Sequence, residues 1–264
     1  MLHARRSAAV LVALPVLLVS LSGCDVVTDH FRAEESAEWR KSYELPANGR
    51  VEIHNVNGRI EVSASSGRTV EVVAFKTARA QSAEAAREAL TKIEIVENVG
   101  SDVVRIETKK PRSGGFFNDG GQVRYTVKVP ASVATELVTV NGGVEVMGLS
   151  GRIRAETTNG GIVGRDVSGA LDASTTNGAI DVDLAQVADG GLKLECTNGG
   201  IKLRLPGDAR ATISASVANG SIDTGGLSLD TTESSPRRLQ ARLNGGGPSI
   251  RIEGTNGGIR ITRR

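Results

Sequence analysis

Asn-Gly pairs recur through the second half of the chain, and they limit the possible folds more than any other feature. The pairs begin at Asn141, Asn159, Asn177, Asn198, Asn219, Asn244 and Asn256. Their successive spacings are 18, 18, 21, 21, 25 and 12 residues, so most units are close to twenty residues long. Repeats of this length are typical of stacked architectures, in which each unit buries its apolar face against its neighbours.

Apolar residues keep fixed positions relative to the asparagine of each pair. The third residue after the asparagine is Val144, Ile162, Ile180, Ile201, Ile222 or Ile259, and only the unit of Asn244 departs from this rule. Two residues before it, the chain places Thr139, Thr157, Thr175, Cys196 or Val217. Alternation on both sides predicts one inward-facing strand before the corner and another after it. Cys196 occupies the threonine position, so we interpret it as a small core residue and not as a nucleophile.

Two architectures are compatible with these offsets. In a hairpin meander, each Asn-Gly pair is a type I′ turn between antiparallel strands. In a β-solenoid, equivalent residues stack in register, and asparagine side chains can form a ladder from coil to coil. The identical Thr-Asn-Gly corners favour stacking, so the sequence predicts an all-β solenoid-like stack of about 18–21-residue repeats. The predicted corner ladder consists of Asn141, Asn159, Asn177, Asn198, Asn219 and Asn256.

The N-terminal half has shorter strand patterns and one helix. Residues 38–136 are expected to form a β region that contains the helix, and residues 137–264 the repeat solenoid. The helix is predicted over "SAEAAREALTKI", with Ser82 as its N-cap. The Gly-rich segment that follows the next strand contains Phe116 and Phe117, either as a contact loop or folded back onto the protein.

The first residues have the features of an export signal. Arg5 and Arg6 precede an apolar run too short to span a membrane, and the run ends in Leu-Ser-Gly-Cys24, which resembles the lipobox of bacterial lipoproteins. This resemblance implies that residues 1–23 are a lipoprotein signal peptide and that Cys24 is acylated. Residues 24–37 are then expected to be a tether, and lipid on Cys24 would anchor the protein to a membrane.

The charge balance excludes a nucleic-acid binder. Removing residues 1–23 removes two arginines, so 32 − 2 = 30 basic residues face 30 acidic residues, without the basic footprint of such proteins. Seven arginines nevertheless lie between residues 231 and 264. They could contact anionic lipid or polysaccharide, but we favour the interpretation that they protect the last coil from edge-to-edge aggregation.

The sequence gives little support for an enzyme. A β-helix enzyme acting on polysaccharide would need paired carboxylates or a calcium site, often with aromatic platforms for sugars. Residues 137–264 contain no Trp, Tyr or Phe, and the only histidines beyond the signal are His30 and His54. We therefore expect no catalytic residues, no metal and no cofactor.

Three segments in order along the chain resemble the bacterial DUF4097 family, which has a toast-rack fold and carries an adhesin label. They are "YELPANGRVEIHNVNGRIEV", the Ala-rich helix, and "VRYTVKVPASVATELVTVNGGVEV" with the later Asn-Gly units. The resemblance implies a right-handed, solenoid-like rack on a cell-envelope protein, with no established catalytic residues.

We therefore expect a membrane-anchored lipoprotein on the periplasmic face of the inner or outer membrane. It would act as an adhesin-like binding or structural module, with an envelope protein or polysaccharide as its partner. The alternatives are a regulatory or sensory accessory protein of the envelope stress response and, less favoured, the polysaccharide-acting enzyme.

Overall fold

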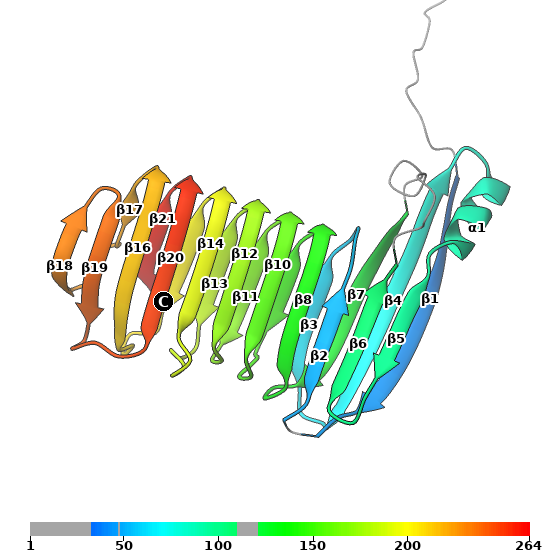
Figure 1. Cartoon of the computed structure of the whole chain (residues 1–264), viewed down its shortest axis with the longest axis horizontal. Helices are drawn as coiled ribbons and strands as arrows, with labels where there is room; N and C mark the ends of the chain where they lie inside the picture. Colours follow the sequence, from blue (N-terminus) through cyan, green and yellow to red (C-terminus); the bar gives the residue numbers. More distant parts are fainter. Residues whose placement is uncertain (1–32, 47, 110–120) are drawn as a thin grey trace, which may run out of the picture. The chain divides into compact units, whose positions relative to one another are not determined.

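The computed structural model describes residues 33–46, 48–109 and 121–264. Within these residues two long β-sheets face each other, and one short helix lies at the N-terminal end of the stack (Figure 1). We call them sheet A, with ten described strands, and sheet B, with eleven.

The strands of sheet A are given in spatial order. They are β1 (Ala33–Glu44), β4 (Thr69–Ala80), β7 (Gln122–Pro130), β3 (Ile60–Ser65), β9 (Val144–Met147), β11 (Ile162–Val167), β13 (Ile180–Leu184), β15 (Ile201–Leu205), β21 (Ile259–Arg263) and β17 (Ile222–Asp223).

Sheet B runs in the same direction through the stack. From the N-terminal end its strands are β5 (Ile95–Val99), β6 (Val103–Thr108), β2 (Arg50–His54), β8 (Ala134–Asn141), β10 (Ile153–Asn159), β12 (Leu171–Asn177), β14 (Leu192–Asn198), β20 (Ser249–Asn256), β16 (Ala211–Asn219), β19 (Arg238–Leu243) and β18 (Leu229–Ser235).

Each repeat forms one coil, with a strand in sheet B, the Asn-Gly corner and a strand in sheet A. Neighbouring coils pair in parallel and in register, so that Asn159 lies opposite Asn141 on one side and Asn177 on the other. A meander would pair neighbouring strands antiparallel. The predicted solenoid-like stack is therefore confirmed, and the coil of β2 and β3 continues it into the N-terminal half.

The last repeat is not at the end of the stack. Strand β20 lies between β14 and β16, and β21 lies between β15 and β17, as Figure 1 shows by the red coil between the yellow and orange ones. The segment between β17 and β20 forms the hairpin of β18 and β19, which pairs antiparallel with β16. Spatial order therefore departs from chain order in one place.

Antiparallel strands close the N-terminal end of the stack. Strand β1 pairs with β4 over its whole length, and the hydroxyl of Tyr43 on β1 donates to Glu97 on β5 at 2.5 Å, which links the two sheets. Strand β1 begins at Ala33, so residues 33–37 of the expected tether are part of a strand. Alternate side chains of this strand are half-buried, which explains why the strand extends beyond the expected boundary.

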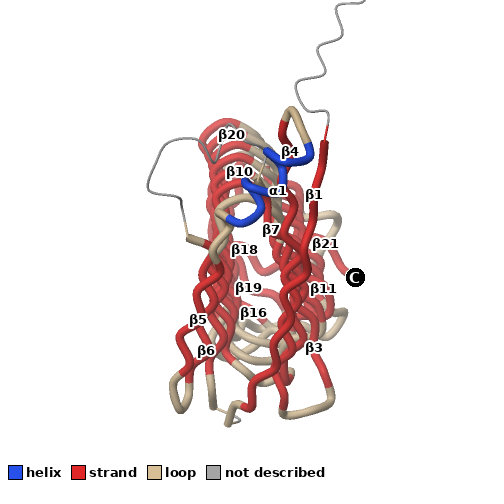
Figure 2. Tube along the Cα trace, turned by 90° about the vertical axis from the view of Figure 1, so that its right-hand side faces the viewer, coloured by secondary structure: helices blue, strands red, loops and turns tan. Residues whose placement is uncertain are grey.

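Helix α1 (Ala83–Thr91) confirms the predicted short helix. Its N-cap is Ser82, whose hydroxyl accepts a hydrogen bond from the amide of Ala85 at 3.2 Å. Ala86 and Ile93 are buried, and the helix packs against β1 and β4. Figure 2 shows it beside the N-terminal end of the space between the sheets.

Inward-facing aliphatic side chains from both sheets form one continuous core. Ile162, Ile180 and Ile201 have no more than 1% of their surface exposed, and they stack in register along sheet A. Fully burying one such side chain contributes about 1.5–3 kcal/mol. Outward-facing residues are consequently free to vary, and it is on the outer faces of the sheets that function can be placed.

Candidate functional site: the corner ladder and the outer faces of the sheets

The six asparagines of the predicted ladder lie in one row along the corners, and each one bonds to its neighbour. The side-chain amide of Asn159 donates to the Oδ1 of Asn141 at 2.8 Å, and that of Asn177 donates to the Oδ1 of Asn159 at 2.9 Å. The row continues through Asn198, Asn256 and Asn219, in that order.

The row includes Asn57, which the prediction omitted. Its Oδ1 accepts from the amide of Asn141 at 2.8 Å. Asn244 lies outside the row, has a φ of 50°, and donates instead to the carbonyl of Ala209. The side-chain amides of the row donate to asparagines of neighbouring coils and do not point towards a common centre. The row is therefore not arranged as a ligand site.

The glycine after each asparagine is required by the close approach of the coils. A Cβ on Gly160 would lie 2.0 Å from the carbonyl oxygen of Gly142, and one on Gly199 would lie 1.9 Å from that of Gly178. Gly199 also has a φ of 151°, whereas the backbone of Gly160 is outside the left-handed region. This contact between coils is not evident from the sequence, and it is the requirement that all corners of the row share.

At four corners the side chain two residues before the asparagine donates to a carbonyl group of the neighbouring corner. The hydroxyls of Thr157 and Thr175 donate to the carbonyls of Gly142 and Gly160, both at 2.8 Å. Cys196 replaces the hydroxyl with its thiol and lies 3.2 Å from the carbonyl of Gly178. Its side chain is buried, and burial raises the pKa of the thiol.

We expect Cys196 to be unreactive in the folded protein. In a Cys24→Ser background, a thiol reagent at pH 7.5 should label it only as fast as the protein opens, because thiolate is scarce and covered. Unfolding in urea should restore ordinary labelling. Cys196→Thr should leave the urea midpoint almost unchanged. Rapid labelling of the folded protein would contradict this assignment.

Three predictions lie outside the described residues. They are the signal peptide over residues 1–23, the lipidation of Cys24, and the contact loop with Phe116 and Phe117. These stay predictions.

The outer face of sheet A carries a compact ion-pair network. Asp181 and Asp183 on β13 lie between Arg165 on β11 and Arg204 on β15. The Nη1 of Arg165 is 2.8 Å from Asp181 and 3.4 Å from Asp183, and Arg204 contacts both carboxylates. Both carboxylates are thus neutralised by arginines on the neighbouring strands, an arrangement that ties three coils together.

This network should make stability depend on pH. Burial raises the pKa of Asp181, but hydrogen bonds and charge from Arg165 and Arg204 outweigh it and hold the pKa below its usual value. The contribution is therefore present above the unfolded pKa of about 3.9 and is lost as the pH falls below it. Asp181→Asn should lower the urea midpoint at pH 7 and flatten its decline towards pH 3. Asp208→Asn, in an exposed turn, is the control and should change neither quantity.

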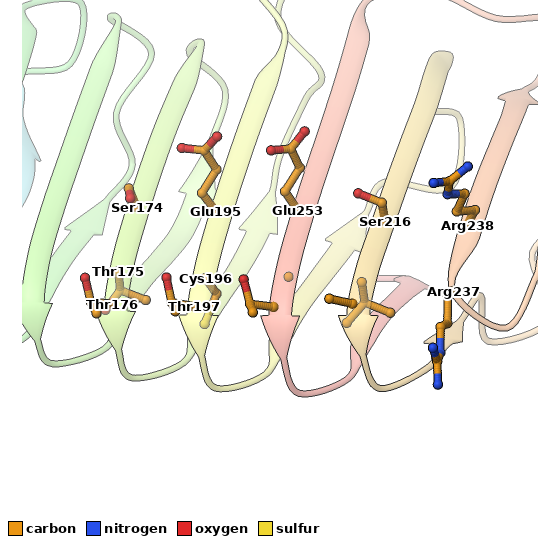
Figure 3. Close-up of a pocket in the computed structure, with 14 residues that line it drawn as sticks. Ser174, Thr175, Thr176, Glu195, Cys196, Thr197, Ser216, Arg237, Arg238 and Glu253 are labelled. Carbon is orange, nitrogen blue, oxygen red and sulfur yellow. The ribbon is translucent and has the colours of Figure 1, made fainter.

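The outer face of sheet B is hollowed near its C-terminal end. This groove of about 580 Å³ crosses β12, β14, β20, β16 and β19, and we call it the sheet B groove (Figure 3). On β16 the short side chain of Ser216 is part of the floor, and it lies in register between Glu253 on β20 and Arg238 on β19. Longer side chains on both neighbouring strands thus form its walls.

Hydroxyl groups follow one edge of the groove. Thr176, Thr197 and Thr255 each precede a corner asparagine, and their strands pair in register, so they form an exposed row. Adjacent strands are about 4.8 Å apart, which sets the spacing of this row. Figure 3 shows Thr176 and Thr197 near the ends of their strands.

The charges around the groove are only partly paired. Glu195 is 2.9 Å from the Nζ of Lys193, and Glu253 is 2.7 Å from the Nε of Arg251, so each acid already has a cation on its own strand. Arg237 and Arg238 are exposed, and among the described residues neither has an acidic partner within ion-pair distance. The uncompensated charge of the groove is therefore positive.

A tight turn fixes the two arginines in position. The amide of Arg238 donates to the hydroxyl of Ser235 at 3.0 Å. The carbonyl of Arg237 accepts from the amide of Val217 at 3.0 Å, and that of Pro236 accepts from Ile222 at 2.9 Å. The turn is thus anchored to both strands of the terminal coil.

A smaller hollow of about 290 Å³ lies on the same face, nearer the other end of the strands. It is lined by Arg152, Asp172, Lys193 and Arg251 among others, and Arg152 has no ion pair among the described residues. Lys193 and Arg251 line this hollow, and their ion pairs with Glu195 and Glu253 of the sheet B groove lie between the two depressions.

The sequence places Arg237 and Arg238 within a basic end but does not place them at a groove. It shows two adjacent arginines after Ser-Ser-Pro. It does not show that the short residue Ser216 lies beside Arg238 in the sheet. Among the described residues, no group of three or more His, Cys, Asp or Glu is arranged to hold a metal ion. In the same part of the chain no helix has the length and apolarity to cross a membrane.

Two stacked, mostly parallel sheets whose outer faces are exposed to solvent define a solenoid-type protein. The family model described as Toastrack DUF4097 matches residues 49–262. The chain therefore belongs to the Toastrack DUF4097 family, which confirms the predicted resemblance.

Two solved structures that are similar to this chain are named as a cell adhesion protein and an adhesin. A "putative cell adhesion protein" from Clostridium sporogenes is 14% identical, with a TM-score of 0.51 over 87% of this chain and 100% of that one. A "putative adhesin" from Bacteroides fragilis is 9% identical, with a TM-score of 0.32 over 86% and 97% of the two chains. A comparison with curated proteins found no match.

Proposed function

We propose that this protein is a non-enzymatic binding module of the cell envelope and that the outer face of sheet B is its binding surface. The observation that carries the proposal is the sheet B groove, where hydroxyls and two arginines without an ion pair among the described residues lie on a repetitive support. Membership of a family whose solved relatives are named as adhesins supports a binding role. It also supports a place at the cell surface or in the envelope.

The proposal includes anchoring through an acylated Cys24. The support is the lipobox-like sequence Leu-Ser-Gly-Cys after an apolar run. Two or more long acyl chains hold a protein stably on a membrane. Cys24→Ala should move the protein from the membrane fraction to the soluble fraction, and unchanged membrane retention would contradict anchoring through this residue.

The binding role is tested with isolated envelope material. Full-length protein in detergent micelles should be retained by purified envelope fractions. Filling the groove with a Ser216→Trp substitution should reduce that retention, whereas Thr126→Trp, an outward-facing position on β7 of sheet A, should not. Equal retention of both variants would show that the binding surface is not on sheet B. Release of new glycan ends from the envelope material would contradict the non-enzymatic role.

A further inference from the structure

We propose that the sheet B groove binds an acidic polysaccharide, whose anionic groups pair with Arg237 and Arg238 and whose hydroxyls bond to the threonine row. This inference rests on the proposed binding role and assigns its ligand class. It depends on four features of the groove: its free charge, its hydroxyls, its length and the lack of aromatic side chains.

The free charge calls for an anionic ligand. Glu195 and Glu253 are satisfied by Lys193 and Arg251 at 2.9 and 2.7 Å, so they do not neutralise the arginines across the floor. Arg237 and Arg238 each offer a planar set of donors that suits carboxylate, phosphate or sulfate groups. Their turn is held by backbone hydrogen bonds, so little further ordering of the backbone is needed on binding.

The hydroxyl row calls for a ligand rich in hydroxyl groups. Thr176, Thr197 and Thr255 are exposed and have no side-chain hydrogen bond among the described residues. Each offers one donor and two acceptor positions. A polyanion without hydroxyls could accept from these threonines but could not donate to them, so it would use only part of their hydrogen-bonding capacity.

The length of the groove calls for a polymer. Its lining crosses five strands in the order β12, β14, β20, β16 and β19. Four strand spacings of about 4.8 Å give roughly 19 Å, with hydroxyls towards one end and the arginines at the other. A polymer chain can span this length and contact both groups at once.

The aromatic content argues against a neutral glycan or a lipid tail. Residues 137–264, which supply the whole groove, contain no Trp, Tyr or Phe, so no side chain offers a face on which a neutral sugar ring can stack. Apart from its buried residues, the lining consists of hydroxyls, carboxylates and guanidinium groups with Ala218 and Gly254. Recognition must therefore depend on charge and hydrogen bonds, and the affinity should fall as salt rises.

The test uses full-length protein in micelles, titrated with alginate as an acidic polysaccharide, dextran as a neutral one and polyphosphate as an anion without sugar. We expect saturable binding of alginate, at least tenfold weaker binding of dextran, and weakening by added NaCl. The Arg237→Gln/Arg238→Gln variant should lose at least tenfold in alginate affinity. Arg68→Gln/Arg124→Gln removes two exposed arginines that also have no ion pair among the described residues, and it should stay within twofold of the parent. Thr197→Val should weaken alginate binding more than polyphosphate binding, because polyphosphate can only accept from this hydroxyl.

Several outcomes would overturn the inference. They are the absence of alginate binding, equal affinity for dextran, equal losses in the two double-arginine variants, or polyphosphate bound as tightly as alginate with the same sensitivity to Thr197→Val. The melting temperatures of all variants are measured, so that a loss of fold is not taken for a loss of binding. If alginate binding fails while envelope retention still depends on the groove, the ligand class is wrong and the proposed function stands. If envelope retention also fails, both are wrong.

Discussion

Replacing Ile259 with alanine should destabilise the protein by about 2–5 kcal/mol, the range for a buried isoleucine. Only 2% of Ile259 is exposed, because strand β21 is covered by β15 on one side and by β17 on the other. In a protein whose total stability is about 5–15 kcal/mol, such a loss is large. Equilibrium unfolding in urea measures it directly.

The matched control is Ile222→Ala. Ile222 is the register partner of Ile259 and belongs to the coil that precedes it in the chain, but it is only partly buried because its coil is the terminal one. Its substitution should cost about half as much or less. If coils stacked in chain order, Ile222 would be interior and Ile259 terminal, and the two costs would be reversed.

Adding one methyl group at Gly199 should be comparably damaging. The new Cβ would lie 1.9 Å from the carbonyl oxygen of Gly178, and the φ of 151° disfavours any residue with a side chain. Overpacking costs about 1–3 kcal/mol and occasionally more, and we expect Gly199→Ala to reach the upper end. The urea midpoint and the melting temperature should both fall.

Gly200→Ala is the control at the next position of the same corner. Its Cβ would lie 3.5 Å from the carbonyl oxygen of Gly258, which is an ordinary contact, and the equivalent position of the Asn177 corner is naturally Ala179. We expect a change within about 0.5 kcal/mol, as for a surface substitution. Equal losses for the two variants would show that glycine is needed here for another reason.

The repeat could be predicted because stacking places the same demand on every coil. Ile162, Ile180 and Ile201 occupy one core position, and Thr157, Thr175 and Cys196 satisfy one kind of carbonyl. A requirement that recurs at a fixed spacing is visible in a single sequence. The same holds for the helix, whose cap at Ser82 is a local feature.

The position of the last coil could not be predicted, because every coil places the same demand on its neighbours. All coils present similar aliphatic rows, so pairing between any two of them satisfies the pattern, and chain order is the natural expectation. The one local signal was Asn244, which breaks the offsets because it lies beyond the β18–β19 hairpin and not at a corner. The hairpin displaces the end of the chain, which then fills the space between β14 and β16.

The sheet B groove required the structure because it depends on neighbours that are distant in the chain. Ser216 is a floor only because Glu253 and Arg238 flank it. Arg237 and Arg238 were interpreted as protection for an edge, and they do lie on the hairpin that borders sheet B. Composition could not show that they have no ion pair among the described residues, nor that they lie on the wall of the groove.

We infer that the corner asparagines are scaffold, and we propose that function lies on the outer faces of the sheets. A double-mutant cycle between Asn159 and Asn177 separates these two roles, with Asn159→Ala, Asn177→Ala and the double variant compared by urea unfolding. The bond of 2.9 Å between the two side chains predicts a coupling free energy of about 0.5–1.5 kcal/mol, with envelope retention unchanged. Additive effects on stability, together with a loss of retention, would contradict the account.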